Sequence, residues 1–261
     1  MKLSIYQVDA FASRVFEGNP AAVIQLDQWL PDALLQAIAT ENNLSETAYL
    51  VAEGEGFRIR WFTPVYEVNL CGHATLASAH TLWQHLGYSG SSLTLYSKSG
   101  PLVVHQNKEG HYTLDFPADQ PQVSPLRDVM AKALGQPVLA AYRGKDDLMA
   151  ILPGQAEVEA LRPDFAAIAA LECRGLIATA PGDTLDFVSR CFFPGAGINE
   201  DPVTGSAHTL MTPYWAAQTG KDQFEAMQLS ARTGKLHCQL KGDRVLLSGQ
   251  AQTYLIGEIF I

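Results

Sequence analysis

The segment Arg190–Leu210 reads RCFFPGAGINEDPVTGSAHTL and joins a predicted strand to a predicted helix. It places an acidic pair, a proline, a glycine and two small hydroxyl residues directly before an apolar helix. So many polar groups at one junction indicate a functional site rather than a simple turn. A similar junction, Phe62–Leu76 (FTPVYEVNLCGHATL), lies in the first half of the chain. Two such junctions predict two halves of similar build.

The two predicted helices that follow these junctions share an unusual composition. Gly72–Leu86 and Thr204–Gln218 contain no Asp, Glu, Lys or Arg, and a glycine ends each of them. A helix without a polar face is buried on most sides, so each could lie inside a curled sheet. Pro213 should bend the second helix or remove one of its hydrogen bonds.

The remaining patterns alternate between strands and helices and predict an α/β (α+β) chain. Three prolines in Pro117–Pro125 mark the expected boundary, which gives halves of residues 1–117 and 118–261. A terminal strand near residues 254–261 is a candidate to pack on the first half. Residues 156–171 are predicted to form one helix.

Composition narrows the class of protein. The formal net charge of −9 argues against nucleic acid as the main partner. No apolar run approaches the roughly 18 residues of a membrane span, and the alternating start of the chain predicts a strand rather than a signal peptide. The cysteines Cys71, Cys173, Cys191 and Cys238 form no CxxC pair, so neither a zinc site nor a redox dithiol is expected. We therefore expect a cytoplasmic enzyme with free thiols, although the even cysteine count leaves disulfides open.

The helix starts are candidate anion sites. Free N–H groups and a partial positive charge at a helix N-terminus suit a carboxylate or phosphate. Gly72 and Gly205 would let a ligand approach that backbone closely. The alternative for either residue alone is an ordinary turn glycine.

Several side chains near these junctions could carry chemistry. His73 could donate a hydrogen bond or move a proton near neutral pH, although a histidine beside a turn is more often structural. Asp201 and Ser206 could cap or begin the second helix as readily as contact a substrate. Glu46 becomes a candidate general base only if its polar connection reaches the site. Cys71, directly before a helix, could be an acidified thiol.

The chain resembles the PhzF-like isomerases of phenazine biosynthesis over essentially its whole length. The resemblance rests on ordered blocks at compatible spacing, namely VDAF at 8–11, FEGNPAAV at 16–23, NLSET at 43–47, RWFTP at 60–64, CGHAT at 71–75 and EDPVTGSA at 200–207. It implies a diaminopimelate-epimerase-like fold, in which two similar halves each curl a mixed sheet around a central helix, with the site in the cleft between them.

The resemblance also implies a type of chemistry. Members resemble cofactor-free, often homodimeric isomerases that shift a proton on a small unsaturated carboxylate, and Glu46 matches the acid/base of the family. The other implied site residues are catalytic His73 and Asp201, with Gly72, Gly205, Ser206 and Asn19 binding the substrate. The sequence sets neither the substrate nor any link to phenazines.

Two rival functions remain. A racemase or epimerase of the same fold would use two thiols, one at each helix start. Cys71 occupies the first such place, but Thr204 occupies the second, and a hydroxyl is too weakly acidic for that role. The other rival is a small-anion-binding protein that kept the fold and lost catalysis.

Overall fold

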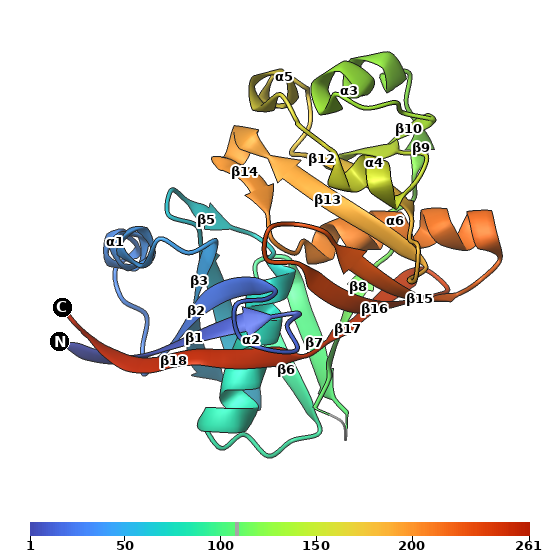
Figure 1. Ribbon diagram of the computed structural model, residues 1–261. Coiled ribbons are helices and arrows are strands. Elements are labelled where there is room, and N and C mark those ends of the chain that lie inside the picture. The colour runs from blue at the N-terminus through green and yellow to red at the C-terminus, as the bar shows by residue number, and fades with distance from the viewer. Residues whose placement is uncertain (108–109) are drawn as a thin grey trace. The chain divides into compact units, whose positions relative to one another are not determined.

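The computed structural model describes residues 1–107 and 110–261, which form two compact units. Unit 1 comprises Met1–Asp115 and Ser248–Ile261, and unit 2 comprises Phe116–Leu247. The chain therefore leaves unit 1 two residues before the expected boundary, and its C-terminal segment returns to that unit. Figure 1 shows the two ends of the chain beside each other, where the Ile261 amide donates to the Met1 carbonyl oxygen over 2.8 Å.

Unit 1 is a mixed sheet with two helices. Its elements are β1 (Lys2–Ala10), β2 (Asn19–Leu26), α1 (Asp32–Asn42), β3 (Glu46–Glu53), β4 (Gly56–Phe62), β5 (Glu67–Val68), α2 (Gly72–His85), β6 (Ser92–Ser97), β7 (Gly100–Gln106), β8 (Tyr112–Pro117) and β18 (Ala251–Phe260). The C-terminal strand β18 pairs antiparallel with β1. Strand β8 crosses the boundary between the units.

Unit 2 is also built from a mixed sheet and helices. Its elements are β9 (Gln122–Val123), α3 (Arg127–Leu134), β10 (Ala140–Arg143), β11 (Leu148–Ile151), α4 (Gln155–Glu159), α5 (Phe165–Ala169), β12 (Leu176–Pro181), β13 (Phe187–Phe193), a 3-10 turn (Pro194–Ala196), β14 (Ile198–Asp201), α6 (Gly205–Thr219), β15 (Gln223–Gln228), β16 (Gly234–Lys241) and β17 (Arg244–Gly249). Strand β17 ends within unit 1.

The two units repeat one strand topology. In unit 1, β1, β2, β3, β4, β6 and β7 pair in that order, and the successive pairs are antiparallel, parallel, antiparallel, parallel and antiparallel. Strands β10, β11, β12, β13, β15 and β16 of unit 2 follow the same pattern. A short strand, β5 or β14, also pairs with the fourth strand, and α2 or α6 follows it. The expectation of two similar halves is confirmed.

Helix α2 is buried as its uncharged sequence predicts. Every residue from His73 to Leu82 is buried, and the helix packs against β1, β2, β3 and β18. Its buried hydroxyls are satisfied within the helix, since Ser78 donates to the Ala74 carbonyl over 2.7 Å and Thr81 donates to the Ala77 carbonyl over 2.9 Å. These bonds offset the cost of burying polar atoms.

Helix α6 continues through Pro213, and the hydrogen bond lost there is replaced. Proline has no N–H to donate to the carbonyl of Thr209, four residues earlier. The backbone N–H of Asp119 donates to that carbonyl instead, over 3.1 Å. The Asp119 carboxylate in turn accepts the backbone N–H of Lys145 over 2.9 Å. A strand connection of unit 2 is thereby tied to the helix at its weak point.

The single helix predicted over residues 156–171 is wrong. Two short helices, α4 and α5, stand there, with Pro163 between them. Pro163 has no N–H to donate to the carbonyl of Glu159, four residues earlier, and a proline disfavours the helical conformation of the residue before it, so one helix cannot run through both segments. Asp164 then caps α5 by accepting the backbone N–H of Ala167 over 3.0 Å.

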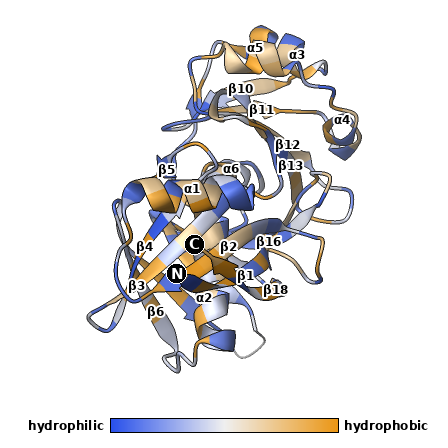
Figure 2. Cartoon of the chain, turned by 90° about the vertical axis from the view of Figure 1, so that its left-hand side faces the viewer, coloured by the Kyte–Doolittle hydropathy of each residue, from blue (hydrophilic) through white to orange (hydrophobic). Residues whose placement is uncertain are grey.

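The core of unit 2 lies between its sheet and its outer helices. Met130 of α3, Val158 of α4 and Phe192 of β13 are fully buried within one apolar cluster. Hydrophobic residues make up most of β12 and β13, whereas the loops between elements are largely hydrophilic (Figure 2). Among the described residues, no helix is both long and apolar enough to cross a membrane.

Burial of His208 in α6 should make the stability of the fold depend on pH. Nδ1 of His208 lies 2.8 Å from the Thr204 carbonyl, and Nε2 has no hydrogen-bond partner among the described residues. Burial lowers the pKa of His208 to about 4. The folded state therefore binds this proton less readily than the unfolded state, so the contribution is complete above pH ~6.5 and is lost as the pH falls toward 4.

We expect this one histidine to remove about 3 kcal/mol of the free energy of unfolding across that range. Urea denaturation of wild type and of His208→Gln at several pH values would measure it, and the variant should have the shallower pH dependence. The matched control is His105→Gln, at an exposed position. Equal pH slopes for wild type and His208→Gln would contradict the assignment.

Candidate active site

In unit 1 the structure brings three predicted site residues into contact. His73, the second residue of α2, lies with its Nε2 atom 3.1 Å from Oε2 of Glu46. Its other ring nitrogen, Nδ1, lies 3.1 Å from Nδ2 of Asn19. All three side chains are almost completely buried, and Gly72 opens the same helix. A carboxylate, an imidazole and an amide thus form one polar group, in which His73 contacts both of the other side chains.

Strand order explains how residues so far apart in sequence meet. Asn19 is the first residue of β2 and Glu46 is the first residue of β3. These strands are parallel and place Ala21 beside Glu46, so the two side chains lie at the same end of the sheet. Helix α2 packs on both strands and brings His73 to that end.

The charge of Glu46 favours a protonated His73. Burial lowers the pKa of His73, and the nearby Glu46 carboxylate opposes this effect and raises the pKa. Nε2 of His73 and Oε2 of Glu46 form an ion pair when the imidazole is protonated.

Cys71 differs from the acidified thiol considered from the sequence. Its Sγ atom lies 3.6 Å from Nδ1 of His73. Burial, together with the nearby Glu46, raises the pKa of Cys71 to about 11. The side chain is therefore a thiol at neutral pH, and the expected acidification by the helix start does not prevail.

Glu46, Cys71 and His73 also place possible metal ligands within 4.8 Å of one another. A carboxylate, a thiol and an imidazole would suit zinc chemically. However, the imidazole nitrogens already face Glu46 and Asn19 within hydrogen-bonding distance. His73 would have to turn from one of these partners to bind a metal ion.

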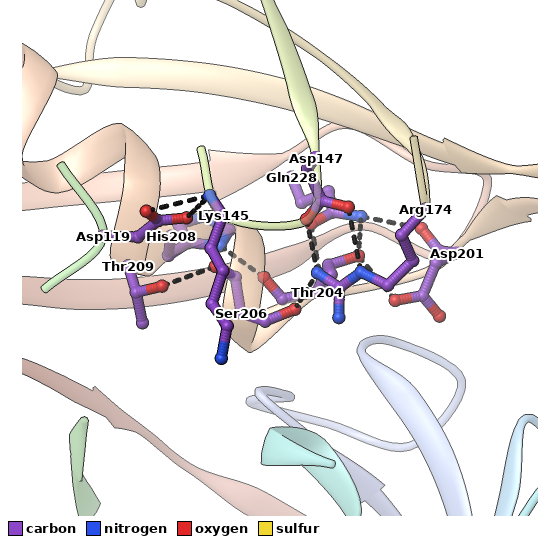
Figure 3. Close-up of polar contacts among 10 residues, drawn as sticks. All are labelled: Asp119, Lys145, Asp147, Arg174, Asp201, Thr204, Ser206, His208, Thr209 and Gln228. Carbon is purple, nitrogen blue, oxygen red and sulfur yellow. Dashed lines mark hydrogen bonds and ion pairs between the residues drawn. The ribbon is translucent and has the colours of Figure 1, made fainter. Parts of the chain in front are cut away.

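In unit 2 the residues around the start of α6 form a second polar group (Figure 3). Thr204, directly before the helix, donates its hydroxyl to Oδ2 of Asp201 over 2.5 Å. Its backbone N–H donates to Oε1 of Gln228 over 2.8 Å, and Nε2 of Gln228 donates to the Asp201 carbonyl over 2.7 Å. Asp201 therefore binds the Thr204 hydroxyl. If Asp201 capped the helix, it would accept the backbone N–H of Thr204, but Gln228 accepts that N–H instead.

The other acid of the predicted pair has a structural role. Glu200 forms a two-point ion pair with Arg190 on β13, at 2.7 and 2.8 Å. Sequence adjacency therefore misleads at this pair, because successive residues of β14 point to opposite sides of the strand.

Ser206 has a partner that the sequence did not indicate. Its Oγ atom accepts a hydrogen bond of 2.9 Å from Nη2 of Arg174, which is held by the carboxylate of Asp147 (Figure 3). Arg174 and Asp147 stand outside every motif. The repeated strand order is the one signal that could have found them. Asp147 directly precedes the second strand of the repeat, and Arg174 lies two residues before the third.

The starts of α2 and α6 share the properties of an anion site. Neither helix has a side-chain cap or an acidic residue in its first turn, and glycine is the first residue of both. Their leading N–H groups and dipoles are thus suited to a negatively charged group.

The repeated topology and these paired helix starts define a diaminopimelate-epimerase-like protein. The family model described as phenazine biosynthesis-like protein, PhzC-PhzF, matches residues 8–257. An uncharacterized isomerase of Pseudomonas aeruginosa is 51% identical over 259 residues, which cover 99% of each chain. The chain belongs to the PhzC-PhzF family and is an isomerase.

Solved structures agree with this assignment. A PhzF-family protein of Enterococcus faecalis is 47% identical, with a TM-score of 0.96 over 100% of both chains. A probable proline racemase of Agrobacterium radiobacter K84 shares the fold at 9% identity, with a TM-score of 0.67 over 99% of this chain and 93% of that one.

Proposed function

We propose that this isomerase moves a proton between two carbons of a small unsaturated carboxylate, with Glu46 as the general acid/base. The observation that carries the proposal is the contact of 3.1 Å between Oε2 of the buried Glu46 and Nε2 of His73. It holds the carboxylate in place and leaves Oε1 to take up a proton.

The reaction balances within the substrate and this one side chain. Glu46 removes a proton from a carbon next to the conjugated system, and the C–H electron pair shifts into that system. The same carboxyl group then returns the proton to another carbon while the double bond moves. No electrons are gained or lost overall, so the step requires no redox cofactor.

The helix starts would supply the electrostatic part of catalysis. Negative charge grows on the substrate as the proton leaves, and fixed N–H donors stabilise such charge effectively. We propose that a helix start of this kind, with Gly72 in α2 or Gly205 in α6, binds a carboxylate, and that Ser206 and Asp201 orient the carboxylate at the start of α6. Formation of a homodimer and a cytoplasmic location stay predictions.

Deuterium exchange tests this function. A panel of small cyclic unsaturated carboxylic acids would be incubated with the protein in heavy water, and proton NMR would follow loss of the allylic signals. At least one acid should take up deuterium, with product formation at a comparable rate. No exchange across the panel would favour the rival in which the protein only binds small anions.

The second rival, thiol racemisation, predicts a different outcome at Cys71. The raised pKa of Cys71 and the engagement of the Thr204 hydroxyl with Asp201 both count against it. We therefore expect Cys71→Ser to retain exchange within about threefold of wild type, because a general acid/base other than Cys71 carries the proton. A fall to background in this variant, with unchanged thermal stability, would favour the thiol mechanism.

A further inference from the structure

A second group of three side chains in unit 2 lies near the corresponding strand and helix starts. In unit 1, Asn19 and Glu46 are the first residues of the second and third strands, and His73 is the second residue of the central helix. In unit 2, Asp147 directly precedes the second strand, Arg174 lies two residues before the third strand, and Ser206 is the second residue of the central helix. Both groups are joined by side-chain contacts.

Arg174 is held in a fixed orientation. Its Nε donates to Oδ1 of Asp147 over 2.9 Å, and Nη2 donates to Oδ2 of the same carboxylate. Asp147 is 4% exposed, so its negative charge has lost most of its water. Arg174 is half-exposed, so the ion pair is only partly buried and adds little to stability. Its benefit lies in the geometry that it imposes on the guanidinium group.

That geometry determines what the Ser206 hydroxyl can do. Nη2 of Arg174 also donates to Oγ of Ser206 over 2.9 Å. A guanidinium group has only donors, so the Ser206 oxygen must act as the acceptor in this contact. The hydroxyl hydrogen is then directed to another atom. In the described part of the chain, Ser206 Oγ donates to no other group.

We propose that Arg174 is a positioning residue that acts through Ser206, fixing its hydroxyl as a hydrogen-bond donor to a carboxylate oxygen of the substrate at the start of α6. This inference rests on the proposed function, because it assumes that the substrate carboxylate binds at that helix start. It assigns distinct tasks to the two groups, with proton transfer in unit 1 and anion recognition in unit 2.

The alternative is a direct contact between Arg174 and the anion. Nη1 of Arg174 makes no hydrogen bond among the described residues and could reach a ligand itself. The two roles differ in one measurable respect. A residue that acts only through Ser206 loses its effect once the Ser206 hydroxyl is removed, whereas a direct ligand keeps it.

A double-mutant cycle with benzoate as the probe tests the proposal. Amide proton–nitrogen NMR spectra of the protein would be titrated with sodium benzoate, and the shifts of Ser206 and its neighbours would give the dissociation constant. We expect Ser206→Ala to weaken binding about 10-fold, the size of one hydrogen bond to a charged group. Arg174→Gln should weaken it similarly, and the double variant no further.

Other variants keep the test decisive. Arg174→Lys preserves the charge, but a lysine cannot contact Asp147 and Ser206 at the same time. This variant should therefore bind benzoate as weakly as Arg174→Gln. It replaces Arg174→Gln in the cycle if Arg174→Gln does not fold. Arg127→Gln, at an exposed arginine of α3, is the matched control and should bind as wild type does. Thermal unfolding of every variant separates loss of binding from loss of structure.

Three results would overturn the proposal. These are no saturable benzoate shifts in wild type, unchanged binding in folded Arg174 variants, or a further loss when Arg174→Gln is added to Ser206→Ala. The last result would make Arg174 a direct ligand. The proposed proton transfer fails by a separate criterion, the absence of deuterium exchange, so failure of one can be told from failure of the other.

Discussion

Replacing Glu46 with glutamine is expected to slow deuterium incorporation by at least about 100-fold, the lower end of what a general acid/base contributes. Glutamine is nearly the same size and can still accept a hydrogen bond from His73, 3.1 Å away in wild type. It cannot take up the substrate proton. The rate should therefore fall while binding of the substrate stays close to that of wild type.

The measurement is the exchange rate in heavy water for the acid that wild type exchanges fastest, with benzoate binding as the check on the intact site. Glu41→Gln, at an exposed glutamate of α1, is the control and should exchange at the wild-type rate. Normal exchange by Glu46→Gln would remove Glu46 from the mechanism and direct attention to His73 or Cys71.

Gly18→Ala should be the most destabilising of the small substitutions considered, at about 4 kcal/mol. Gly18 has a φ of +67°, where a side chain is strained, and an added Cβ atom would lie 2.1 Å from the Ala10 carbonyl oxygen. The Ala10 carbonyl is backbone at the end of β1, and the added Cβ would also lie 3.0 Å from the Cβ of Ala12, so neither can move aside cheaply. The next residue, Asn19, contacts His73, so substrate turnover should fall as well.

Gly54→Ala separates the two contributions. Gly54 has a similar φ of +58°, but beyond its chain neighbours no atom lies within 4 Å of the position that an added Cβ atom would take. The substitution should therefore cost only the backbone strain, about 1 kcal/mol. Urea denaturation of both variants gives the comparison, and similar losses of stability would show that the overlap with Ala10 is relieved by a backbone shift.

The sequence indicated much of the architecture because the central helices have a distinctive composition. A helix without charged residues is stable in water only if most of its surface is buried. Glycine at each end marks its limits, and α2 and α6 begin within a residue of their expected starts. Pro163 carried the information that the helix over 156–171 is broken. Periodic apolar residues on both sides of that proline concealed the break.

The candidate site was less accessible to sequence reasoning. His73 and Glu46 stood in recognisable motifs, and their contact in unit 1 follows from parallel pairing of β2 and β3. Arg174 and Asp147 are ordinary charged residues by composition and become notable only when the two strand orders are superimposed. For Cys71, burial outweighs the helix start in setting the pKa, and the degree of burial is a property of the folded chain.

The meeting of the two ends of the chain has a practical consequence. Unit 1 is discontinuous in sequence only because β18 returns to β1 after unit 2 is complete. Ile261 and Met1 already share a hydrogen bond, so a few added residues could join them as a surface loop. Opening the chain in the loop after β8 would give a circular permutant in which unit 2 comes first and β18 leads directly into β1. Such a rearranged gene would let the two units be produced, labelled or exchanged as separate modules.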